Sequence, residues 1–194
     1  MDTESSTFSQ LVDEAILTEA FESARPRLLE MARRRIGPGL SGRIDEEGVV
    51  QNAYLNARRR WMAATEKPTD LYPWIYGIVR DQAIDEIRAA TGLNRNAGRD
   101  APWPDSSVAE LAMRLAPAQT GPSTAAARKE MSGLVRLAIR QLKPVDQEIL
   151  SMHYFDGLTF PQIGAVLGMT ENAANVRCVR ALLRLKKRLP SMGA

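Results

Sequence analysis

The segment from Thr159 to Leu189 places two helical patterns on either side of a single glycine, and it constrains the fold more than any other part of the chain. Thr159 and Gln162 have the spacing of a capping box, which starts the first helix, and Gly168 ends it. Thr170 then supplies an N-cap for the second helix. A short helix, a tight turn and a longer helix are the parts of a helix-turn-helix.

Two opposite faces distinguish the second helix of this segment. With a step of about 100° per residue, one side is apolar and the other is cationic. The apolar stripe consists of Cys178, Leu182, Leu185 and Leu189, and the cations roughly opposite are Arg177, Arg180, Arg184 and Lys187. A helix that reads DNA packs one face on its own core and offers cations and amides to phosphates and base edges. A solvated amphipathic helix has the same periodicity, so the caps and the glycine turn are what favour DNA binding.

Charge is distributed unevenly along the chain, although the net charge is only +3. Residues 1–24 hold six acidic residues and no basic one, and residues 25–90 have a net charge of +3. Residues 91–127 are balanced, and residues 128–194 have a net charge of +6. Two basic blocks on either side of a neutral connector suit a protein that contacts a polyanion at two places.

Neither a membrane span nor a secretion signal is indicated. No apolar run approaches the about 20 residues that cross a bilayer. The first residues are acidic, whereas a signal peptide begins with basic residues and continues with an apolar stretch. We therefore expect a cytoplasmic protein without membrane insertion.

Residues for catalysis or metal binding do not cluster in the sequence. The chain has one cysteine, Cys178, and one histidine, His153, so we expect neither a disulfide nor a zinc site. Cys178 lies on the apolar stripe and is interpreted as a core residue. The run from Gly37 to Gly42 matches a dinucleotide-binding pattern, but a basic helical stretch precedes it instead of a strand, so we interpret it as a loop. The sequence favours a non-enzymatic protein without metal or cofactor.

Helical periodicity runs through the rest of the chain, and strand-like alternation is absent from the pattern. Residues 91–127 are rich in Pro, Gly, Ala and Ser; this stretch has room for a short helix near Val108 to Leu115 but is not expected to form a core. We predict an all-α fold of two small helical domains joined by this flexible linker. The other predicted helices are Phe8–Ile36, broken or bent near Pro26, then Glu46–Met62, Pro73–Ala90, Ala126–Leu142 and Val145–Tyr154.

Two of these predicted helices have polar faces with a candidate function. On the helix from Glu46, the predicted core face consists of Val49, Val50, Ala53, Tyr54, Ala57 and Trp61. The opposite face holds Gln51, Asn52, Leu55, Asn56 and Arg59. This second face is either a docking surface or a solvated face with one exposed leucine. The helix from Pro73 has a ladder of Ile75, Val79, Ala83 and Ile87 opposite Trp74, Arg80, Asp81, Asp85 and Arg88. Trp74 beside arginines suits the stacking of an unpaired base, and it equally suits a half-buried packing residue.

Three stretches of the chain resemble the extracytoplasmic-function (ECF) sigma factors, which belong to the sigma-70 family of bacterial RNA polymerase. The resemblance covers about residues 21–90 and 128–189. Its most specific part is LKPVDQEILSMHYFDGLTFPQIGAVLGMTENAANVRCVRALLRLKKRL, from Leu142 to Leu189; the other two are DEEGVVQNAYL and WIYGIVRDQAIDEIR. The resemblance implies an acidic N-terminal segment (residues 1–20), a region 2-like domain (21–90), a linker (91–127) and a region 4-like helix-turn-helix domain (128–190).

In that family the first domain docks on core RNA polymerase and captures the unpaired minus-ten strand, and the second domain reads the minus-thirty-five duplex. The resemblance therefore implies a factor that directs core polymerase to promoter DNA, with an anti-sigma factor as a further partner. By position, Gln51, Asn52, Leu55 and Asn56 match the polymerase-docking helix, Trp74, Arg80 and Arg88 match the strand-capturing helix, and Asn172, Asn175, Val176, Arg177 and Arg180 match the recognition helix. Arg184 and Lys187, farther along that helix, are expected to meet phosphates.

This chain departs from the family pattern at several positions. Gly48 and Asn52 stand where acidic residues are usual, and Gly77 and Asp81 stand where Arg and Asn are usual. Losing a cation and gaining an anion should weaken strand binding. The alternative function is a conventional helix-turn-helix regulator that does not dock on core polymerase; it explains the C-terminal segment but not the Trp74 helix.

Overall fold

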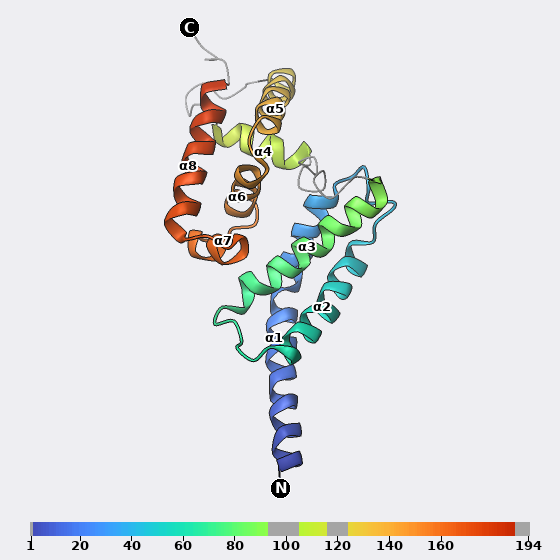
Figure 1. Ribbon diagram of the computed structural model, residues 1–194. Coiled ribbons are helices and arrows are strands. Elements are labelled where there is room, and N and C mark those ends of the chain that lie inside the picture. The colour runs from blue at the N-terminus through green and yellow to red at the C-terminus, as the bar shows by residue number, and fades with distance from the viewer. Residues whose placement is uncertain (1, 93–104, 116–123, 189–194) are drawn as a thin grey trace. The chain divides into compact units, whose positions relative to one another are not determined.

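The computed structural model describes residues 2–92, 105–115 and 124–188, without the side chains of residues 2–10, 105–107 and 114. Every regular element in these ranges is a helix, as predicted. The helices are α1 (Asp2–Ile36), α2 (Glu46–Ala63), α3 (Leu71–Thr91), α4 (Asp105–Leu115), α5 (Ala125–Arg140), α6 (Pro144–Tyr154), α7 (Phe160–Leu167) and α8 (Glu171–Arg188). The chain forms two compact units, residues 1–98 and 99–194; α1 to α3 lie in the first and α4 to α8 in the second (Figure 1).

In the first unit, three helices pack against one another, each touching the other two. The predicted ladder of α3 is confirmed, since Ile75, Val79, Ala83 and Ile87 are all buried. The predicted core face of α2 is also buried, except that Tyr54 is half-exposed. From α1, the core receives Leu17, Phe21, Leu28 and Met31. Asp45 and Asp70 cap α2 and α3 by accepting hydrogen bonds from backbone N–H groups two residues on.

Helix α1 is longer and more continuous than predicted. It begins at Asp2 and runs through Pro26, where the sequence predicts a break or a bend, so the helix is not broken there. A proline inside a helix costs about 3 kcal/mol through a lost hydrogen bond and a ring clash. Packing of the buried Phe21 and Leu28, before and after the proline, offsets this cost.

The first unit also reaches further toward the N-terminus than residue 21. The Trp61 indole donates a hydrogen bond to the Asp13 carbonyl oxygen (2.8 Å), and Asp13 forms an ion pair with Lys67. Arg58 donates to the Glu14 carboxylate at 2.7 Å, and this contact raises the pKa of the guanidinium. The boundary expected at residue 20 thus falls within a helix that already packs on α2.

Helix α4 corrects the expectation that residues 91–127 contribute no core. Its position agrees with the short helix allowed near Val108 to Leu115, but Val108, Leu111 and Ala112 are buried and the helix packs against α5. Three apolar side chains within five residues make one helical stripe, which is enough to cover the apolar face of a neighbouring helix. The rest of the expected linker, residues 93–104 and 116–123, lies outside the described residues.

Replacing Leu111 with alanine tests this role of α4. Leu111 is fully buried, so we expect the second unit to lose about 2–5 kcal/mol of unfolding free energy. Met113, on the same helix, is 54% exposed, and Met113→Ala should change stability by no more than about 0.5 kcal/mol. Denaturant unfolding of the full chain measures both. Equal stability of the two variants would show that α4 does not belong to the core.

Candidate nucleic-acid interface

The turn between α7 and α8 has the predicted caps. Thr159 Oγ1 accepts from the Gln162 backbone N–H at 3.5 Å, and Gln162 Oε1 accepts from the Thr159 backbone N–H at 3.2 Å, which completes the capping box. Gly168 ends α7 in the left-handed conformation at φ 65°. Thr170 Oγ1 accepts from the Ala173 backbone N–H at 3.2 Å and so caps α8. These side chains fix where α8 begins.

Gly164 brings α7 and the start of α8 into close contact. A Cβ atom at this position would lie 2.6 Å from the Met169 carbonyl oxygen and 3.4 Å from the Glu171 backbone nitrogen. The Met169 N–H also donates to the Gly164 carbonyl oxygen at 2.9 Å. Only a residue without a side chain allows this approach, so Gly164 sets the distance between α7 and the turn.

The buried face of α8 differs slightly from the predicted stripe. Cys178 and Leu185 are buried as predicted, but Leu182 is only half-buried, and Leu189 lies outside the described residues. Ala174 and Ala181 complete the buried face instead. The difference arises because alanine carries little weight in a hydrophobic pattern, although it is well suited to a close helix contact. Burial raises the pKa of the Cys178 thiol to about 11, so this cysteine is an unreactive core residue.

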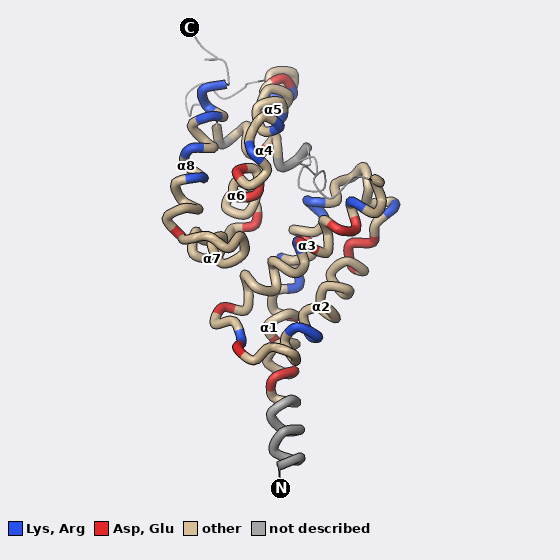
Figure 2. The backbone as a smooth tube through the Cα atoms, viewed as in Figure 1, with Lys and Arg blue, Asp and Glu red and all other residues tan. Residues whose placement is uncertain are grey.

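The outward face of α8 carries most of the side chains that the sequence predicts to bind DNA. Asn172, Asn175, Arg180 and Lys187 are exposed, and Val176 is half-exposed. Figure 2 shows basic residues along α8 toward its C-terminal end. Arg180 and Lys187 make no hydrogen bond or ion pair with other described residues. Two apolar side chains that the sequence pattern does not single out, Val179 and Leu183, are 49% and 60% exposed on the same helix.

Arg177 and Arg184 are placed differently from Arg180. Both lie at the flank of α8 and donate to one buried carboxylate, that of Asp146 on α6, at 3.1 Å and 2.8 Å. The sequence pattern assigns both arginines to DNA and gives Asp146 no role. No local pattern reveals the pairing, because Asp146 precedes its partners by 31 and 38 positions.

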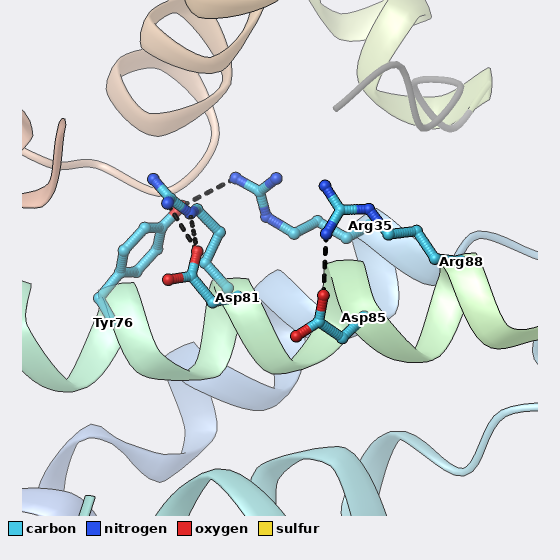
Figure 3. Close-up of polar contacts among 6 residues, drawn as sticks. Arg35, Tyr76, Asp81, Asp85 and Arg88 are labelled. Atoms are coloured by element: carbon cyan, nitrogen blue, oxygen red, sulfur yellow. Dashed lines mark hydrogen bonds and ion pairs between the residues drawn. The ribbon is translucent and has the colours of Figure 1, made fainter. Parts of the chain in front are cut away.

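In the first unit, the arginines of α3 are already paired with carboxylates (Figure 3). Arg80 donates to Asp81 through Nε (3.0 Å) and Nη2 (2.6 Å), and Arg88 donates to Asp85 at 2.8 Å. The two arginine side chains are mostly covered, whereas both aspartates are exposed. The structure therefore places the predicted strand-binding cations behind an acidic surface.

Two further residues border this part of α3. Arg35, in the basic run that ends α1, donates to the Tyr76 hydroxyl at 3.2 Å (Figure 3). The sequence shows this basic run, but only the fold brings it to α3. Trp74 is half-buried and lies 5.9 Å from Trp61, measured between ring centroids. Its partly exposed ring is compatible with both roles considered for it.

The face of α2 that the sequence predicts to be a docking surface points to solvent. Gln51 and Asn52 are exposed, Leu55 is 49% exposed, and Asn56 accepts a hydrogen bond from Arg60 at 3.2 Å. Met62, two turns beyond Leu55, is 40% exposed and extends the apolar part of this face. An exposed leucine and methionine among polar groups are suited to contact another protein.

His153, the single histidine of the chain, contributes to the packing around α7. His153 stacks on Phe160 at 4.5 Å between ring centroids, and its Nδ1 lies 3.2 Å from the Leu158 carbonyl oxygen, so it packs beneath α7. Among the residues described, no group of three or more His, Cys, Asp or Glu side chains is arranged to hold a metal ion. None of the described helices is long and apolar enough to cross a membrane.

Comparison with known proteins identifies relatives of this chain. Residues 132–185, from α5 to α8, match the family described as sigma-70, region 4. The ECF RNA polymerase sigma factor SigD of Mycobacterium tuberculosis (strain H37Rv) is 26% identical over 181 residues, which cover 93% of this chain and 80% of the relative. The ECF RNA polymerase sigma factor BldN of Streptomyces coelicolor is 24% identical over 199 residues, or 97% of this chain and 68% of the relative. The probable RNA polymerase sigma factor RfaY of Xanthomonas campestris pv. campestris is 29% identical over 145 residues, which cover 74% of this chain and 34% of the relative.

Replacing Gly164 with alanine should separate α7 from the turn. The added methyl group would overlap a backbone oxygen that cannot rotate away, so we expect a loss of about 1–3 kcal/mol of stability. A methyl group added at Gly133 in α5 would meet no atom within 4 Å, and Gly133→Ala should stabilise by roughly 0.5–1 kcal/mol. Thermal unfolding distinguishes the two. A Gly164→Ala variant as stable as the parent would refute the close contact.

Proposed function

We infer that this chain, a member of the ECF sigma factors of the sigma-70 family, directs core RNA polymerase to specific promoters in transcription initiation. The observation that carries this conclusion is the match of residues 132–185 to sigma-70 region 4, in a segment that folds as a capped helix-turn-helix. The similarity to SigD covers 93% of this chain and so includes the three-helix unit as well. A conventional regulator leaves that unit unexplained, and a sigma factor has no need of catalytic residues.

For the second unit we propose that α8 enters the major groove of the minus-thirty-five duplex. Its exposed polar side chains, Asn172, Asn175 and Arg180, can make hydrogen bonds to base edges, and half-exposed Val176 can contact a thymine methyl group. Lys187, toward the C-terminal end, is suited to a phosphate. Arg177 and Arg184 keep free donors beside Asp146 and are about half exposed, which also suits phosphate contacts.

For the first unit we propose two surfaces. Gln51, Asn52, Leu55 and Asn56 form the contact with core polymerase, and Trp74, Arg80 and Arg88 contact the unpaired minus-ten strand. The partly exposed aromatic ring supports stacking on a base, since such stacking is worth about 1–3 kcal/mol. We also propose that the first domain comprises α1 to α3, with residues 21–90 as its main part, and that the second domain adds α4 to residues 128–190.

Further partners and location follow from this function. Such a protein would act in the cytoplasm, where core polymerase transcribes. Exposed Val179 and Leu183, beside the cations of α8, offer apolar area that DNA phosphates do not require. We therefore include an anti-sigma factor among the proposed partners.

Reconstituted transcription tests the function directly. Purified chain and core RNA polymerase should give transcripts from a subset of a promoter library, and core polymerase alone should not. The chain alone should bind the same promoters poorly. Equal promoter binding with and without core polymerase, and no new transcripts, would contradict the proposal and favour a conventional regulator.

Substitutions of Arg180 and Lys187 should affect promoter binding in different ways. Arginine can bond guanine O6 and N7 together, which discriminates between bases by about 1–3 kcal/mol, so Arg180→Ala should relax preference at one or two positions. Lys187→Ala should weaken all promoters alike and reduce the salt dependence by about one unit. Selection from a library randomised at the minus-thirty-five element measures both. An unchanged preference for Arg180→Ala would mean that another face of α8 reads the bases.

A further inference from the structure

The carboxylate of Asp146 is the buried member of an ion-paired cluster that joins α6 to α8. Asp146 is 2% exposed, whereas the side chains of Arg177 and Arg184 are 43% and 49% exposed. Each carboxylate oxygen has its own arginine: Oδ1 accepts from Arg177 and Oδ2 accepts from Arg184. The cluster therefore contacts the interior through its anion and solvent through its two cations.

Because the Asp146 carboxylate is buried, its hydrogen bonds to Arg177 and Arg184 strongly restrict where α8 can lie relative to α6. An ionised carboxylate without partners in a protein interior is costly, so Asp146 depends on both arginines. Hydrogen bonds between charged groups are about twice as strong as neutral ones. The first turn of α6, where Asp146 lies, favours a negative charge as well. The pairing is thus unlike the exposed ion pairs of the first unit, which contribute little.

The geometry of the cluster restricts how α8 can move. Arg177 and Arg184 are two helical turns apart, about 10 Å along the axis, and they reach the same carboxylate. Ala181 lies between them in sequence and is fully buried, and α6 and α8 pack directly against each other. Because the two arginines reach one carboxylate from positions seven residues apart, sliding α8 along its axis would draw at least one of them away from it.

We propose that Asp146 is a positioning residue that fixes the axial register of α8, and so determines which side chains of α8 meet the bases. The inference rests on the proposed function of α8 as the duplex-binding helix. Arg177 and Arg184 brace the helix and use their free donors for phosphates. Base reading belongs to the outward face, where Arg180 lies.

A simple counter-charge would behave differently. If Asp146 only reduced the positive charge of α8, its removal would tighten binding to every duplex and leave sequence preference unchanged. If Asp146 positions α8, its removal changes sequence preference and nonspecific affinity in different ways. Its removal lowers preference while the affinity for random duplex stays the same or rises.

The matched variants are Asp146→Asn and Glu130→Gln. Both remove one negative charge from the second unit, but Glu130 is exposed on α5. Each variant is assembled with core RNA polymerase and used to select from duplexes randomised at the minus-thirty-five element. We expect Asp146→Asn to reduce enrichment of the preferred sequence by about tenfold, the size of one lost base contact, and Glu130→Gln to preserve it. Salt titration on a random duplex measures the nonspecific affinity.

The outcomes separate this inference from the proposed function. Asp146→Asn with the parental preference, at either the same or higher overall affinity, would overturn the positioning role and leave the proposed function intact. A parent holoenzyme without any upstream preference would overturn both. Thermal unfolding shows whether Asp146→Asn is folded; if it is not, Arg177→Gln and Arg184→Gln each leave one bond in place. Both are then expected to lower preference, and parental preference in both would overturn the inference.

Discussion

Close backbone contact around α8 is the constraint on which the second unit depends. Gly164 lets the turn approach α7, and Ala174 and Ala181 keep the inner face of α8 small. Because these residues add little bulk, α8, an eighteen-residue helix whose outer face is charged, packs closely on α5, α6 and α7. The caps at Thr159 and Thr170 then satisfy backbone donors that would otherwise be left at the helix starts. Because α8 packs through its small inner residues, the charged side chains of its outer face stay available for the proposed contact with DNA.

Local signals in the sequence are sufficient to predict the helix-turn-helix and the α3 ladder. Capping residues, the glycine at 168 and apolar spacing all act within one or two turns, so they can be read without the fold. The packing of α4 escapes such a prediction because Val108, Leu111 and Ala112 form a short stripe among prolines and glycines. The ion pairs of Asp146 escape it because only tertiary structure brings α6 and α8 together. Site residues can thus be assigned to helices from the sequence, but their mutual contacts cannot.

The acidic N-terminal part of the chain serves the first unit, at least where its side chains are described. Asp13 pairs with Lys67 and Glu14 with Arg58, both from outside α1. Exposed pairs of this kind contribute little to stability because solvent screens them. The larger contribution comes from Leu17 and Phe21, which are almost completely buried against the other helices. Charge asymmetry in the sequence therefore reflects helix packing here as much as any contact with polyanions.

The carboxylates on α3 affect how the proposed strand-binding surface would work. Asp81 and Asp85 hold Arg80 and Arg88, and they are themselves exposed. A phosphate that approached either arginine would meet the exposed carboxylate paired with it, which repels the phosphate and competes with it for the guanidinium, so the net gain would be small. The remaining attraction would come chiefly from stacking on Trp74 and from cations outside these pairs. Strand capture by this chain would then depend less on salt than duplex binding by α8, where Arg180 and Lys187 have no partner among the described residues.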